Sequence, residues 1–91
     1  MARIEDETGS FLGFSRDISV GGLFIETKTP PLAGTVVKLR FSLEDGGPVV
    51  LVQAEVRYMI PDLCMGVEFL DLPATDRSRI EAYVMRAESA A

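Results

Sequence analysis

The chain has 91 residues, 47% of them hydrophobic and 25% charged, a composition that predicts one small folded domain over residues 1–91. Its formal net charge of −5 argues against broad nucleic-acid binding and against attraction to anionic membranes, because both use basic surfaces. The chain has neither a secretion-signal layout at its start nor an apolar stretch of the about 20 residues that span a bilayer, so we expect a cytoplasmic location.

The sequence contains one cysteine, Cys64, and no histidine. Zinc sites usually draw on several Cys and His ligands, and Ser or Cys nucleophiles most often rely on a His base. We therefore expect no catalytic residue, no metal, no cofactor and no enzyme activity. The neighbouring acids of residues 5–7 and 44–45 are expected to be solvated, and Cys64 is expected to be a small packed residue.

Short apolar runs broken by Gly, Pro and Asp follow one another from Phe11 to Leu70, as in an antiparallel sheet or a small barrel. The expected strands cover about residues 2–6, 11–17, 23–27, 35–43, 49–59 and 64–70. Pro30 and Pro31 place a loop before the fourth strand, because proline cannot continue ladder pairing. Residues 44–47 are expected to form the turn of a hairpin.

A period of two assigns the faces of the central strands. The residues expected to face the core are Val37, Leu39, Phe41, Leu43, Val50, Val52, Ala54, Val56, Tyr58, Met65, Val67 and Phe69. Val49, Leu51 and Met59 fall on the outer face. This apolar strip either binds a partner or is covered by another element of the fold.

The period then changes to that of a helix over about residues 75–87. Ile80, Tyr83, Val84 and Ala87 recur at i, i+3, i+4 and i+7 and form an apolar stripe that can lie across one barrel opening. Thr75 is the predicted N-cap. Asp76 is favoured near the positive end of the helix dipole, and residues 88–91 are expected to fray.

One polar turn stands out within residues 15–27, SRDISVGGLFIET, where Asp17, Ser19 and Gly22 form a D-x-S-x-x-G pattern. A carboxylate, a hydroxyl and a glycine at this spacing can place side-chain acceptors and a close backbone approach on one spot, which suits a planar polar ligand. The same residues also form ordinary Asx and Ser/Thr turns. The spacing alone leaves both interpretations open.

The segment resembles the second signature of PilZ domains, bacterial receptor modules for cyclic di-GMP. The resemblance continues in order through PLAGTVVKLRF, QAEVRY, MGVEFLDL and the final helix, over about residues 4–87. It implies an all-β fold, a small six-stranded antiparallel β-barrel of the split-barrel type over about residues 2–70, with one C-terminal α-helix. It also implies that Asp17, Ser19 and Gly22 contact cyclic di-GMP: Asp17 at the guanine edge, Ser19 as an orienting group and Gly22 through close backbone approach.

The chain departs from the family pattern in its arginines. PilZ receptors usually carry an R-x-x-x-R element before the first strand, whereas this sequence has Arg3 alone there and no two arginines four residues apart. Paired arginines suit guanine faces and phosphates because a guanidinium stacks and forms hydrogen bonds together. Arg16 and Arg3 are auxiliary candidates for ligand contact, although strand alternation should turn Arg16 away from Asp17.

Two functions remain open at this stage. In one, the domain binds cyclic di-GMP, weakly or with arginines supplied from outside these 91 residues, and reports to a protein partner. In the other, ligand binding is lost and the domain is a protein-protein interaction adaptor. The sequence does not indicate an oligomeric state.

Overall fold

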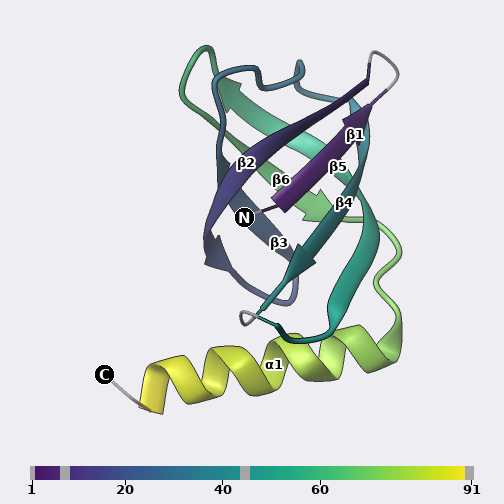
Figure 1. Ribbon diagram of the computed structural model, residues 1–91, viewed down its shortest axis with the longest axis vertical. Helices are drawn as coiled ribbons and strands as arrows, with labels where there is room; N and C mark the ends of the chain where they lie inside the picture. Colours follow the sequence, from purple (N-terminus) through teal and green to yellow (C-terminus); the bar gives the residue numbers. More distant parts are fainter. Residues whose placement is uncertain (1, 7–8, 44–45, 90–91) are drawn as a thin grey trace.

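The computed structural model of the protein describes residues 2–6, 9–43 and 46–89. Its elements are β1 (Ala2–Asp6), β2 (Gly9–Ile18), β3 (Gly22–Glu26), β4 (Val36–Ser42), β5 (Val49–Ile60), β6 (Cys64–Phe69) and α1 (Ala74–Ser89). The strands close into one antiparallel barrel in the order β1-β2-β3-β6-β5-β4 (Figure 1). The predicted six-stranded barrel with one C-terminal helix is confirmed.

Strand β4 shows how the sequence pattern builds the barrel wall. Val37, Leu39 and Phe41 are buried, whereas Lys38 and Arg40 between them are exposed. The period of two therefore sends aliphatic and aromatic groups inward and cations to the outer surface. Other strands contribute in the same way to a single core, which includes Ile4, Leu23, Ile25, Val50, Val52, Ala54, Val56, Met65, Val67 and Phe69. Cys64 is also buried, as expected for a packed thiol.

Strand β5 departs from strict alternation near its end. The β5–β6 register shifts between Val56 and Tyr58, which marks an irregularity of the β-bulge type. The prediction that Tyr58 faces the core is wrong, because this residue is 50% exposed. Met59, assigned to the outer face by the sequence pattern, instead packs against the core. The irregularity thus exchanges the two faces of β5 and presents a tyrosine to the surface.

The other two residues of the predicted apolar strip do lie outside. Val49 is 42% exposed and Leu51 is 63% exposed, so neither α1 nor β1 covers Leu51. Strands β4 and β5 pair in antiparallel register from Val36 and Glu55 to Ser42 and Val49, as a hairpin requires. Of the predicted hairpin turn, Glu44 and Asp45 lie outside the described residues.

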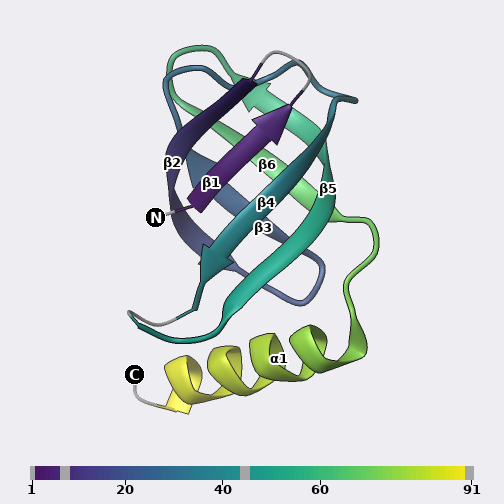
Figure 2. The same ribbon diagram turned by 45° about the vertical axis from the view of Figure 1, so that its right-hand side comes forward.

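Helix α1 lies across the barrel end that carries the β2–β3 and β4–β5 connections (Figures 1 and 2). Ile80 is fully buried and belongs to the core, and Val84 packs against the core, so these two residues of the predicted stripe cover this opening. The side chain of Ala87 lies outside the described residues. The helix begins earlier than predicted, because the Pro73 carbonyl already accepts a 2.9 Å hydrogen bond from the Arg77 N–H. Thr75 is therefore in the first turn with Asp76, and its assignment as N-cap is wrong.

Shortening the side chain at the centre of this helix should weaken the barrel. We expect Ile80→Ala to lower the free energy of unfolding by about 2–5 kcal/mol, because it removes a fully buried side chain and leaves a cavity. Met85→Ala on the same helix, where Met85 is 67% exposed, should change it by less than about 0.5 kcal/mol. Urea unfolding measures both, and equal effects of the two substitutions would contradict closure of the core by α1.

Candidate functional site

The β2–β3 turn is held together by Ser19. Its Oγ accepts hydrogen bonds from the backbone N–H groups of Gly21 (3.2 Å) and Gly22 (3.3 Å), and its own N–H donates to the Gly22 carbonyl (3.0 Å). These bonds form a Ser/Thr turn of the kind that the spacing allowed. A serine hydroxyl accepts at two positions and donates one hydrogen. With both acceptor positions in use, the exposed Ser19 hydroxyl has its hydrogen available for an acceptor outside the turn.

Gly22 is required by the packing of β3 against β6. Gly22 lies opposite Glu68 in the antiparallel register, and a Cβ atom added to it would overlap the backbone carbonyl oxygen of Val67. The next residue of β6 continues the contact, since the Phe69 N–H donates a 2.9 Å hydrogen bond to the Gly21 carbonyl. The glycine of the motif therefore has a role in the fold itself, which brings the turn tightly against β6.

Asp17 lies in an irregular part of β2. The β2–β3 register shifts between Ser15 and Ile18, so strict alternation fails around the motif and both Arg16 and Asp17 are exposed. Within the described part of the chain, the Asp17 carboxylate takes part in no hydrogen bond or ion pair. A carboxylate in this condition offers all its acceptor positions to a ligand.

All three motif residues line one shallow cavity with a volume of about 340 Å³. Its remaining lining comes from the start of β3 and from facing parts of β5 and β6, and includes Ile18, Gly21, Leu23, Phe24, Arg57, Tyr58, Gly66, Val67 and Glu68. A volume of this size is at the lower end of the range for small-molecule sites. The fold thus brings the three motif residues together with groups from two strands that are distant in the sequence.

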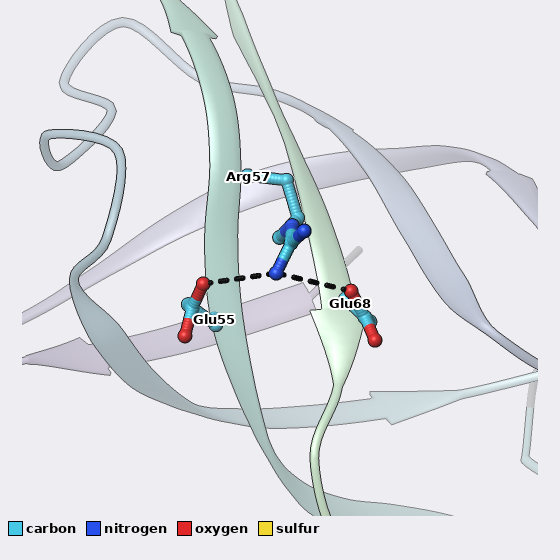
Figure 3. A network of polar contacts seen from close by, with 3 residues as sticks. All are labelled: Glu55, Arg57 and Glu68. Atoms are coloured by element: carbon cyan, nitrogen blue, oxygen red, sulfur yellow. Dashed lines mark hydrogen bonds and ion pairs between the residues drawn. The ribbon is translucent and has the colours of Figure 1, made fainter.

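Arg57 supplies a guanidinium group to this cavity, and this group forms ion pairs with two carboxylates (Figure 3). Its Nη1 lies 3.2 Å from Glu55 Oε2 and 3.3 Å from Glu68 Oε2. Glu55 and Glu68 are direct cross-strand neighbours on β5 and β6, where two like charges repel, and Arg57 bridges them. The sequence pattern does not bring Arg57 to this site, because its neighbours depend on the β5–β6 register.

Tyr58 supplies an aromatic surface in the same cavity. A Cβ atom at Gly66, its register partner on β6, would overlap the Tyr58 ring, so the ring lies directly over the glycine backbone. The β5 irregularity is what turns this ring outward. A half-exposed ring beside hydrogen-bonding groups can stack on a planar heterocycle. Sequence reasoning missed this residue by placing it in the core.

The two auxiliary arginines do not line this cavity. Arg16 Nε forms an ion pair with Glu26 Oε1 at 2.9 Å on the surface of β2 and β3. Arg3 lies within β1, between Leu12 of β2 and Arg40 of β4, in another part of the barrel wall. The cavity lining therefore contains one arginine, Arg57, and two carboxylates, Asp17 and Glu68.

Alanine substitution of the two adjacent glycines should show whether the close contact with β6 is what requires glycine in this turn. Gly22→Ala should lower the free energy of unfolding by about 1–3 kcal/mol, because the new methyl group meets the backbone of a central strand. Gly21→Ala is the control, since a Cβ there is no closer than 3.8 Å to its nearest neighbour, Ser19 Oγ. Urea unfolding should show little loss for Gly21→Ala, and equal losses would contradict the β3–β6 contact as the reason for Gly22.

The family model described as PilZ domain matches residues 1–86. A search of curated proteins gave no match. PilZ is a family of binding and regulatory domains linked to cyclic di-GMP signalling. Over the described residues, no helix is both long and apolar enough to cross a membrane, and no group of three or more Cys, Asp or Glu is placed to hold a metal ion. The family match covers nearly the whole length of the chain, and the closed barrel with a helix at its end agrees with it. The chain therefore belongs to the PilZ domain family.

Proposed function

We propose that this chain is a non-catalytic signalling domain of the bacterial cytoplasm that binds cyclic di-GMP in the cavity beside the β2–β3 turn. The observation that carries the proposal is the convergence of Asp17, Ser19 and Gly22 on one cavity in a PilZ chain. Convergence alone also suits a turn without a ligand. The Asp17 carboxylate, which has no partner among the described residues, and the outward Tyr58 ring add groups that the turn itself does not use.

Each group has a role that follows from its chemistry. The Asp17 carboxylate accepts hydrogen bonds from the N–H groups at a guanine edge. The Ser19 hydroxyl donates to an acceptor on the ligand, because the turn occupies its lone pairs. The Tyr58 ring stacks on a base, a contact worth about 1–3 kcal/mol in proteins that bind single-stranded nucleic acids.

The charges of the same cavity lead us to expect weak binding by the chain alone. The ligand carries two phosphates, whereas Asp17 and Glu68 oppose an anion and Arg57 is shared between two carboxylates. If two charged contacts of about 1.5–3 kcal/mol each are missing relative to an R-x-x-x-R receptor, affinity falls by about 10² to 10⁴-fold. Arginines from a partner would restore it.

A second candidate function, an adaptor that binds protein without a nucleotide, is favoured by one surface. Leu12, Phe14 and Leu63 are 54%, 58% and 58% exposed, and they share the lining of a cavity of about 460 Å³. Exposed apolar groups gathered in this way are typical of protein interaction sites. The cyclic di-GMP titration below distinguishes the two functions.

Loss of the motif carboxylate should abolish most of the binding. In calorimetric titration with cyclic di-GMP we expect weak saturable binding, reduced about 10- to 100-fold by Asp17→Asn because one charged hydrogen-bonding group is lost. Asp62→Asn is the control, since Asp62 is an exposed acid in the β5–β6 turn at the other end of the barrel. No heat from the unmodified chain at millimolar ligand would reject the proposal in favour of the adaptor.

Removal of the carboxylate next to the arginine should have the opposite effect. Glu68→Gln removes one of the two acids that hold Arg57 and one negative charge from the cavity lining, so affinity for cyclic di-GMP should rise about tenfold. Glu81→Gln, at an exposed position of α1, makes the same charge change away from the cavity. Equal gains in the two variants would show that only net charge matters and would contradict a role for Arg57.

A further inference from the structure

A row of four outward side chains crosses strands β2, β1, β4 and β5, on the part of the barrel wall opposite the cavity at the β2–β3 turn. Leu12 of β2 lies opposite Arg3 of β1, Arg3 lies opposite Arg40 of β4, and Arg40 lies opposite Leu51 of β5. All four are exposed, the two leucines to 54% and 63%. Barrel closure through β1 and β4 therefore makes two exposed arginines direct cross-strand neighbours, with an exposed leucine as the next neighbour on either side.

Directly opposed like charges destabilise a strand pair. On the β5–β6 surface, the like-charged pair Glu55 and Glu68 is bridged by Arg57. The pair of Arg3 and Arg40 has no such bridge, since neither forms an ion pair within residues 2–6, 9–43 and 46–89. An anion bound between the two arginines would balance their charge, since no described carboxylate forms an ion pair with either of them.

The surface around the pair is hollowed. A cavity of about 380 Å³ is lined by Arg3, Glu5, Lys38, Leu39, Arg40, Leu51, Val52, Gln53 and Asp71. Three cations and two carboxylates line it, so its local balance is positive in a chain whose net charge is −5. Lys38 lies opposite Glu5, the next outward pair along β1 and β4. Arg3 and Arg40 are thus the two lining cations whose cross-strand neighbour is itself a cation.

We propose that the β1–β4–β5 surface is a second ligand site, which binds the phosphate group of a small phosphate-bearing molecule between Arg3 and Arg40. Two guanidinium forks match the geometry of a phosphate dianion, Lys38 adds a third donor, and Leu51 provides an apolar wall for the rest of the ligand. The site is separate from the cavity at the β2–β3 turn, and it does not depend on the function proposed above.

The test uses inorganic pyrophosphate as the probe and two-dimensional NMR of the whole chain at constant ionic strength. We expect saturable amide shifts at Arg3, Lys38 and Arg40, with residues 17–22 unaffected. Arg40→Gln should weaken the binding about 10- to 100-fold. Arg16→Gln, which removes an exposed arginine already paired with Glu26, should leave it unchanged. Shifts that do not saturate, or equal losses in the two variants, would overturn the proposal.

Thermal unfolding provides a second readout that does not depend on one variant. Pyrophosphate should raise the Tm of the unmodified chain and of Asp17→Asn, but not that of Arg40→Gln or Arg3→Gln. Without pyrophosphate, the two arginine variants should be at least as stable as the unmodified chain, because each relieves the opposition of like charges. Stabilisation of all variants alike would overturn the site.

Two further measurements separate this site from other sources of phosphate and from the cavity at the β2–β3 turn. The chain should stay in the supernatant after sedimentation of phosphatidylglycerol vesicles, and sedimentation that Arg40→Gln abolishes would overturn the assignment to a small molecule. Arg40→Gln should retain whatever binding of cyclic di-GMP the unmodified chain shows. Failure of pyrophosphate binding alone would therefore reject only the second site.

Discussion

The close approach of β3 to β6 is the constraint on which the candidate site depends. Gly22 meets the Val67 carbonyl with no room for a side chain, and the Gly21 carbonyl accepts a hydrogen bond from Phe69. This contact joins the β2–β3 turn to the wall formed by β6 and β5. Without this contact, Asp17 and Ser19 would belong to an isolated turn and would not share a cavity with Arg57 and Tyr58.

The described outer surface of the barrel has two cross-strand pairs of like charge, and their surroundings differ. On β5 and β6 a guanidinium lies between two carboxylates and is itself held in place by them. On β1 and β4 two arginines are direct cross-strand neighbours, and neither forms an ion pair with a described residue. Because an ion pair at an exposed site contributes only about 0–1 kcal/mol, neither arrangement decides the stability of the fold. Their importance lies in where each surface attracts or rejects an anion.

Periodicity predicted most of this fold, and its failures have physical causes. The alternation in β4 and the stripe around Ile80 identified core positions correctly, since one buried face repeats regularly in each element. An extra residue in a strand leaves no mark in the sequence pattern, so a strict period of two places Tyr58 and Met59 on the wrong faces. Thr75 is a suitable capping residue, but the helix had already begun at the carbonyl of Pro73.

The candidate site was predictable only in its local part. Asp17, Ser19 and Gly22 are close in the sequence, so a turn signature could identify them together. Arg57 joins them through the β5–β6 register, and Arg3 meets Arg40 only because the barrel closes. Neither of these contacts follows from the spacing of the residues in the sequence.

Closure also decides how another protein can recognise this domain. Each strand of the ring is paired with a neighbour on both sides, so no strand of the described barrel is the edge of an open sheet. Pairing on one side only is confined to strand ends, such as residues 14–18 of β2 beyond its register with β1 and residues 57–60 of β5 beyond its register with β4. Over the rest of the described barrel, a partner contacts side chains of the outer wall, the connecting turns or the helix, and the specificity of a complex there comes from their shape and charge.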